Sequence, residues 1–128
     1  MESIKDAVSW FEIPVTDFDR AKTFYQAIFE YEMPVMDMAG IQMGILPHDR
    51  DAGGIGGAIC SGEGYSPAGS QGPKVYLNCG NDLNTVLGRV EAAGGKPVFP
   101  KTEIGPGMGH FAFFSDSEGN VVGLYSTN

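Results

Sequence analysis

The stretch Ile13-Pro14-Val15-Thr16-Asp17-Phe18-Asp19-Arg20-Ala21 joins an apolar run to an amphipathic one and decides the fold. Residues 8–15 are typical of a strand, and Thr16-Asp17 supplies short side-chain oxygens that can accept from the free N–H groups of a starting helix. The next residues are apolar at near-helical spacing, which predicts a helix from about Phe18 with one apolar face. That face comprises Phe18, Ala21, Tyr25, Ile28 and Phe29.

Three short strands are predicted after this helix, because apolar runs of four to six residues alternate with turns. They cover residues 35–38, 41–46 and 55–60. Residues 61–73 are rich in Gly, Ser and Pro and predict a linker or an exposed loop.

The second half of the chain repeats the same order. A strand at 74–79 precedes a cap at Asn81-Asp82 and a helix whose apolar positions are Leu83, Val86, Leu87 and Val90. Gly94-Gly95 is typical of a left-handed helix end, and strands follow at 97–99, 109–115 and 121–125.

A repeat of about half the chain predicts an α+β fold with two tandem βαβββ modules, residues 1–60 and 74–128, in one domain that spans 1–128. Two four-stranded sheets that meet edge to edge would form a curved, partly open barrel with a ligand cleft.

The composition narrows the possible partners. A net charge of -8 and a pI near 4.5 would repel a nucleic-acid backbone, so we expect no nucleic-acid partner. We expect no membrane partner either, because no apolar run reaches the roughly 18 residues of a membrane helix. The N-terminus lacks the apolar core of a signal peptide, which predicts a cytoplasmic protein. Cys60 and Cys79 lie in apolar segments and are expected to be reduced.

Two motifs carry a family resemblance. The opening stretch together with Phe24-Tyr25 resembles the opening motif of the glyoxalase/bleomycin-resistance/dioxygenase (vicinal oxygen chelate, VOC) superfamily, and Asp116-Ser117-Glu118-Gly119-Asn120 resembles its closing turn. With the repeat, the resemblance covers nearly the whole chain. It implies a cleft for a small-molecule ligand and, in many members, a homodimer.

The enzymes of this superfamily hold a divalent metal on inward-facing His and Glu residues, where it polarises a substrate oxygen. The resemblance places these ligand positions at Trp10, Val75 and Gly123, with a further counterpart near Gly57. None of these side chains offers a metal a lone pair, and a register shift of one residue supplies no ligand set. We therefore predict no metal and no cofactor.

Strand alternation supplies candidate ligand-binding residues in the first module. It places Trp10, Glu12 and Pro14 on one face, toward the cleft. Glu12 is our main polar candidate, as a general base or as the counter-ion of a cationic ligand. Trp10 offers a surface for stacking, or it fills the space of the missing metal.

Other candidates come from the second module and the linker. Val75, Leu77 and Cys79 are predicted to form an apolar cleft wall near Gly123. His110 either assists Glu12 in proton transfer or, as is commoner for a single strand histidine, packs and hydrogen-bonds within its strand. Tyr65 lies in the glycine-containing linker, which is predicted to fold over a bound ligand.

Four functions follow from these patterns. The first is metal-independent binding of a small molecule in the cleft. The second is a lyase or isomerase that uses Glu12 as base, and the third is a metal-dependent glyoxalase-like or dioxygenase-like enzyme, should the ligand register differ. The fourth is an interaction module whose open sheet edges pair with another subunit.

Overall fold

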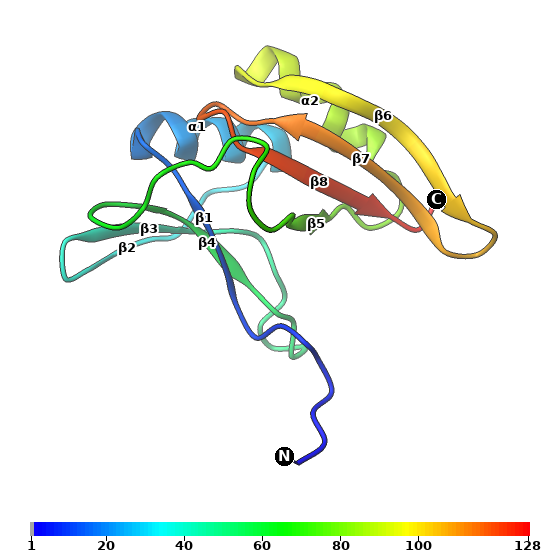
Figure 1. The fold of residues 1–128 in the computed structure, drawn as a ribbon, viewed down its shortest axis with the longest axis horizontal. Coiled ribbons are helices and arrows are strands. Elements are labelled where there is room, and N and C mark those ends of the chain that lie inside the picture. The colour runs from blue at the N-terminus through cyan, green and yellow to red at the C-terminus, as the bar shows by residue number, and fades with distance from the viewer. Residues whose placement is uncertain (1) are drawn as a thin grey trace.

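The computed structural model describes residues 2–128, and each half of the chain builds its own four-stranded sheet (Figure 1). In the first half, β1 (Phe11–Pro14) leads into α1 (Phe18–Phe29), and β2 (Val35–Met38), β3 (Ile41–Ile45) and β4 (Gly57–Ser61) follow. The strand order is β1-β4-β3-β2, with β1 parallel to β4 and the other pairs antiparallel.

The second half has the same order and topology. It contains β5 (Tyr76–Asn78), α2 (Asn84–Ala93), β6 (Lys96–Gly105), β7 (Gly109–Ser115) and β8 (Val121–Ser126). Its strand order is β5-β8-β7-β6, and β5 and β8 are the parallel pair. The α+β fold of two βαβββ units is therefore confirmed.

One apolar core lies between the helices and one face of each sheet. Strand alternation sends Ile13, Ile59 and Leu124 to this side, where they meet Phe24 and Ile28 of α1. The aromatic rings of Phe24 and Phe114 lie 5.9 Å apart, so the first helix packs against a strand of the second sheet. The opposite face of each sheet carries no helix, and we call it the open face.

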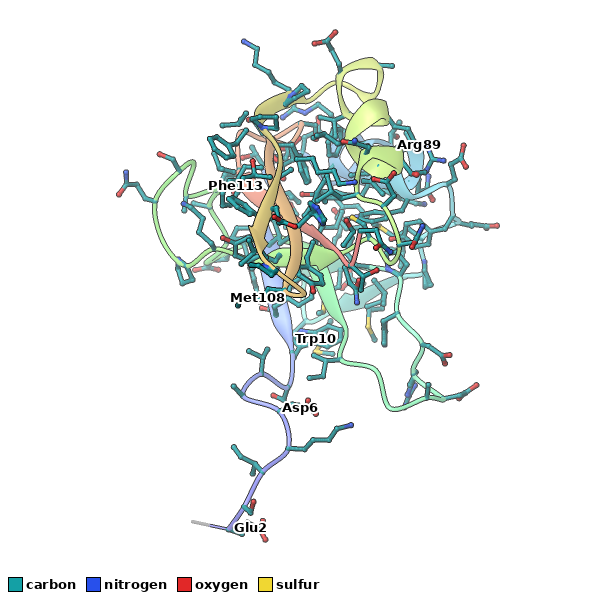
Figure 2. The ribbon with its side chains drawn as sticks, turned by 90° about the vertical axis from the view of Figure 1, so that its right-hand side faces the viewer. Glu2, Asp6, Trp10, Arg89, Met108 and Phe113 are labelled. Atoms are coloured by element: carbon teal, nitrogen blue, oxygen red, sulfur yellow. The ribbon has the colours of Figure 1, made fainter. Side chains whose placement is uncertain are left out.

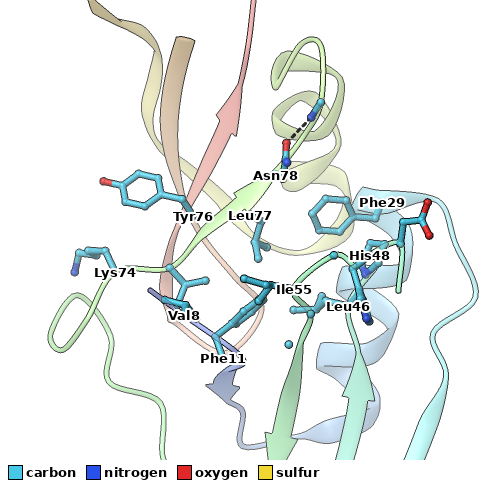
Figure 3. Close-up of a pocket in the computed structure, with 17 residues that line it drawn as sticks. Val8, Phe11, Phe29, Leu46, His48, Ile55, Lys74, Tyr76, Leu77 and Asn78 are labelled. Carbon is cyan, nitrogen blue, oxygen red and sulfur yellow. Dashed lines mark hydrogen bonds between the residues drawn. The ribbon is translucent and has the colours of Figure 1, made fainter. Parts of the chain in front are cut away.

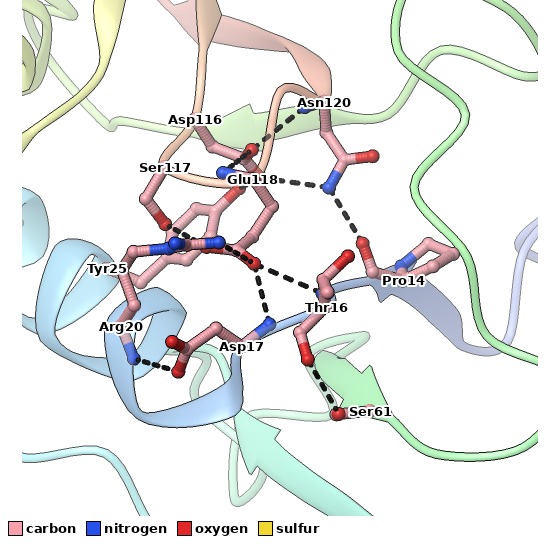
Figure 4. A network of polar contacts seen from close by, with 10 residues as sticks. All are labelled: Pro14, Thr16, Asp17, Arg20, Tyr25, Ser61, Asp116, Ser117, Glu118 and Asn120. Carbon is pink, nitrogen blue, oxygen red and sulfur yellow. Dashed lines mark hydrogen bonds and ion pairs between the residues drawn. The ribbon is translucent and has the colours of Figure 1, made fainter.

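The opening and closing motifs contact one another directly (Figure 4). Asp17 caps α1 by accepting from the backbone N of Arg20 at 3.1 Å, as predicted. The buried carboxylate of Glu118 accepts from the backbone N of Thr16 at 3.1 Å and from that of Asp17 at 2.7 Å. It also pairs with Arg20, at 2.7 Å from Nε and 3.0 Å from Nη2. Asn120 donates to the Pro14 carbonyl at 2.7 Å, so the closing turn fixes the point where β1 becomes α1.

Several strand bounds differ from the sequence-based expectation, and β1 and β6 differ most; β4 covers Gly57–Ser61 rather than 55–60, and β5 covers Tyr76–Asn78 rather than 74–79. β1 begins at Phe11 rather than at residue 8, and β6 runs from Lys96 to Gly105 rather than over 97–99. Pro97 and Pro100 are tolerated in β6 because it is an edge strand with register shifts, where a missing N–H breaks no ladder.

The second helix lacks the predicted side-chain cap, because its N-cap residue is Leu83, which makes no capping hydrogen bond. Asp82 accepts from the backbone N of Asn84 at 3.0 Å, and Gly94 ends the helix in the left-handed region at φ 107°. Among residues 2–128, the structure contains no helix of the length and apolarity that a membrane span requires.

Candidate functional site

The open face of the first sheet carries one carboxylate in apolar surroundings. Glu12 accepts from the Tyr65 hydroxyl at 2.6 Å and from the Trp10 indole Nε1 at 3.3 Å. Met43 and Cys60, both buried, lie beside it on β3 and β4. This arrangement presents a negative charge bordered by two aromatic rings, which suits a flat or positively charged ligand.

Two groups next to Glu12 stay protonated at neutral pH. Burial, and then the charge of Glu12, raises the pKa of the Cys60 thiol to about 12. The hydrogen bond to Glu12 raises the pKa of Tyr65 to about 12. Cys60 is therefore not a nucleophile in this state, and the Tyr65 hydroxyl acts as a hydrogen-bond donor.

Tyr65 reaches Glu12 from the linker predicted to fold over a ligand. Gly62 and Gly64, on either side of Glu63, have φ values of 143° and 91°, which bend the chain back toward the sheet. The Tyr65 ring packs on the group of Met43, Ala58 and Cys60. The structure thus brings Trp10, Glu12 and Tyr65 together across 53 residues of sequence.

The open face of the second sheet is aromatic. Tyr76 is 50% exposed and lies 5.5 Å, centroid to centroid, from Phe113. Phe111 stacks on Phe99 at 5.8 Å and meets the edge of Phe113 at 5.7 Å. Figure 2 views the molecule from the side that bears Phe113 and Met108, with Trp10 below them on the first sheet. Strand alternation could have located these rings, because their neighbours Ala112 and Phe114 face the core.

The predicted second wall of the cleft does not lie on this open face. Leu77 is buried in the core, and Val75 and Cys79 pack against the same core from the helix side. Val75 and Leu77 instead line a cavity on the helix side, because sequence alternation alone does not say which face of β5 the helix covers. Burial raises the pKa of Cys79 to about 11, so this thiol is also unreactive at neutral pH. Tyr76 and Asn78 occupy the open face instead.

His110 also lies on the helix side and cannot assist Glu12. It belongs to the same face of β7 as buried Ala112 and Phe114, and it pairs across to Ser126. Its Nδ1 is buried, and within residues 2–128 no hydrogen-bond partner reaches it.

The positions where the superfamily holds its metal are occupied differently here. A Cβ on Gly123 would lie 2.4 Å from the Tyr76 ring, so this ring fills the space of a side chain at that position. A Cβ on Gly57 would lie 2.4 Å from the Phe11 ring, on the core side. Among residues 2–128, no three His, Cys, Asp or Glu side chains gather as a metal site would require. These residues do not fit the divalent metal that the resemblance implies.

Sequence comparison agrees with this fold. The model of the bleomycin resistance protein-like N-terminal family matches residues 8–44. A glyoxylase-like domain-containing protein of Didymella fabae is 30% identical over 117 residues, which cover 89% of this chain and 88% of the relative. This chain therefore belongs to the glyoxalase/bleomycin-resistance/dioxygenase (vicinal oxygen chelate) superfamily.

Solved structures show the same fold at low identity. UcmS2 superposes with a TM-score of 0.66 at 22% identity, covering 95% of this chain and 98% of that one. A mutant of the fosfomycin resistance protein FosX from Listeria monocytogenes, complexed with Mn(II), gives 0.64 at 17% identity, with 95% and 90% covered. Glyoxalase I from Zea mays gives 0.67 at 16% identity. The match covers 91% of this chain but only 43% of the maize chain, so our chain spans less than half of its length.

Proposed function

We propose that this protein binds a small, flat, positively charged molecule at its open faces without a resident metal ion. The observation that carries the proposal is Glu12, whose carboxylate stands between the Trp10 indole and the Tyr65 hydroxyl on an otherwise apolar sheet face. A cation that reaches this face would gain both a counter-charge and an aromatic surface.

The electrostatics of the chain favour such a ligand. The net charge of -8 attracts small cations over long range and repels anions. The rings of Tyr76, Phe111 and Phe113 give the second open face a surface for stacking, with no charged side chain among them. The family model that matches this chain is named for bleomycin resistance, and the resemblance includes metal-free members that bind cationic antibiotics such as bleomycin.

The proposal that the site works without metal rests on the chemistry of the side chains. Trp10 and Gly123 carry no metal-binding group, Val75 packs on the helix side, and the Tyr76 ring covers Gly123. The Glu12 carboxylate is itself engaged by two hydrogen-bond donors.

Trp10 provides the assay, because it is the one tryptophan of the chain and touches Glu12. Metal-free bleomycin, titrated in the presence of EDTA, should quench its fluorescence to saturation. Glu12→Gln should weaken binding about tenfold, since a hydrogen bond to a charged group contributes roughly 1.5–3 kcal/mol. Glu63→Gln is the matched control, because Glu63 is exposed on the same loop as Tyr65. Equal affinities for both variants, or a fluorescence unchanged by bleomycin and by a panel of flat cations, would refute the proposal.

A lyase or isomerase function is the second candidate, and the 2.6 Å contact between Glu12 and Tyr65 favours it. Glu12 would accept a proton next to a substrate carbonyl, and the Tyr65 hydroxyl would turn from Glu12 to donate its one hydrogen to the developing oxyanion. Any activity found by substrate screening should fall at least 100-fold in Glu12→Gln. An activity that the substitution leaves intact would exclude this role.

We also infer a homodimer. The large apolar side chains of both open faces and of the edge strands are about half exposed, which is costly for an isolated monomer. Sedimentation velocity at micromolar concentration should show a species of twice the chain mass, and a monomer would contradict this inference. The cytoplasmic location stays a prediction.

A further inference from the structure

A separate cavity lies between the two halves of the chain on the side opposite Glu12 (Figure 3). Its volume is about 650 Å³, within the range of about 300–1,000 Å³ found for small-molecule sites. Phe11 and Leu77, the helix-side residues of β1 and β5, form facing walls, and Phe29 and Leu46 extend them. The cavity therefore has an apolar body built by both halves.

Glycines shape one wall of this cavity. A Cβ on Gly56 would lie 2.6 Å from the His48 imidazole, and one on Gly57 would lie 2.4 Å from the Phe11 ring. Both rings can lie flat on the backbone only because these side chains are missing.

His48 supplies a hydrogen-bonding group of defined polarity at one end. Its Nδ1 lies 3.1 Å from the Leu46 carbonyl oxygen, which can only accept, so Nδ1 carries the proton in the neutral ring. Nε2 is then an acceptor, and no group within residues 2–128 donates to it. A ligand hydroxyl group that donates a hydrogen bond to Nε2 would satisfy this nitrogen.

The charges around the cavity favour an uncharged occupant. Lys74 lies at the end away from His48 and disfavours a cation there, while the net charge of -8 disfavours anions. The carboxylate of Asp49, also at the rim, accepts from the backbone N of Ala52 at 3.1 Å and so is held within its own turn.

We propose that this cavity binds an uncharged, flat, apolar molecule with one hydroxyl group, of the phenol or naphthol class, whose hydroxyl donates to His48 Nε2. The cavity differs from the proposed cation site at Glu12, because Phe11 of β1 lines it and Glu12 does not; Tyr76 borders both the cavity and the aromatic open face.

The test uses 2-naphthol and 2-methoxynaphthalene, which share a ring system but differ in the hydroxyl donor. Calorimetry at pH 8, where an ordinary imidazole is neutral, should show 2-naphthol binding about fivefold more tightly. His48→Ala should remove that preference. Amide shifts in NMR should centre on Gly56 and Gly80 rather than on Phe111 and Phe113.

A cavity-filling variant with a matched control completes the test. Ile55, which is 38% exposed in the loop lining the cavity, can be changed to Trp, and Val98, exposed on β6 outside the cavity, serves as control. Ile55→Trp should abolish binding of both compounds, whereas Val98→Trp should retain it. Equal binding of the two compounds to the wild type, retention in Ile55→Trp, or shifts confined to the aromatic open face would overturn the inference. None of these outcomes decides the proposal for Glu12, which the bleomycin titration of the wild-type protein tests separately.

Discussion

Replacing Glu118 by Gln tests the contact between the opening and closing motifs. Glu118 receives donors from Thr16, Asp17 and Arg20 of the first half, and from the Ser117 hydroxyl at 2.9 Å. The net effect of these bonds, against the cost of burial, lowers the pKa of Glu118 from 4.5 to about 2. A lowering of this size corresponds to about 3 kcal/mol in favour of the charged form. Because Arg20 is half exposed, solvent screens its charge, and we expect Glu118 to contribute about 2 kcal/mol to the free energy of unfolding.

Urea unfolding followed by circular dichroism measures the stability that Glu118→Gln loses. For a slope of about 2 kcal/mol per molar urea, Glu118→Gln should lower the midpoint by about 1 M. The melting temperature should fall by about 8 °C. Glu63→Gln, which changes an exposed carboxylate, should leave both values unchanged.

The loss should also depend on pH. Because the pKa of Glu118 is lowered in the folded state, its stabilising effect is complete above about pH 4.5 and disappears as the pH falls toward about 2. The stabilities of wild type and Glu118→Gln should therefore approach each other as the pH falls from 4.5 and converge below about pH 2. A variant within 0.5 kcal/mol of wild type at pH 7, or a difference unchanged at pH 2.5, would refute the role assigned to this carboxylate.

Three further substitutions or probes test the packing. Tyr25→Phe removes the 2.8 Å hydrogen bond to buried Asp116, so urea unfolding should show a loss of about 1–3 kcal/mol, and the pKa of Asp116, already raised by burial, should rise further in NMR titration. Cys60, with its pKa of about 12, should not react with a thiol reagent at pH 7.5 until urea unfolds the chain; rapid labelling of the native protein would contradict its burial. Gly57→Ala should lower the free energy of unfolding by about 1–3 kcal/mol, because the new Cβ meets the Phe11 ring, which packs against the core. Gly123→Ala should lower it by less than 1 kcal/mol, because the Tyr76 ring that its Cβ meets is half exposed and can turn away. Equal losses in the two alanine variants would show that this difference in packing is unimportant.

The fold could be predicted from local patterns because each pattern has a local physical cause. The cap at Asp17 is a contact over three residues, and the glycine end of the second helix depends on one φ angle. The resemblance in Asp116–Asn120 located the closing turn, but not its partner. The contact of Glu118 with Thr16 and Arg20 spans about 100 residues, and no local pattern reports it.

The site was predicted less completely, for a reason that concerns strand faces. For β1, the pattern was unambiguous because Ile13 and Val15 are apolar and Glu12 is not, and the structure brings Glu12 and Trp10 together. β5 and β7 carry apolar residues on both faces, so alternation could not assign Leu77 or His110 to the helix side. The side chain of Phe111 was missed for the same reason, and the sequence left open whether Tyr76 lines a pocket or packs.

The central claim is that the site binds its ligand without a resident metal ion. The most direct measurement is the metal content of the purified, untagged protein by plasma mass spectrometry, paired with thermal melts in Ni²⁺, Zn²⁺, Fe²⁺ and Mn²⁺. We predict substoichiometric metal and an unchanged melting temperature with each ion, because Trp10, Val75 and Gly123 provide no ligands. Stoichiometric metal together with a raised melting temperature would contradict the claim and would favour glyoxalase-like or dioxygenase-like chemistry.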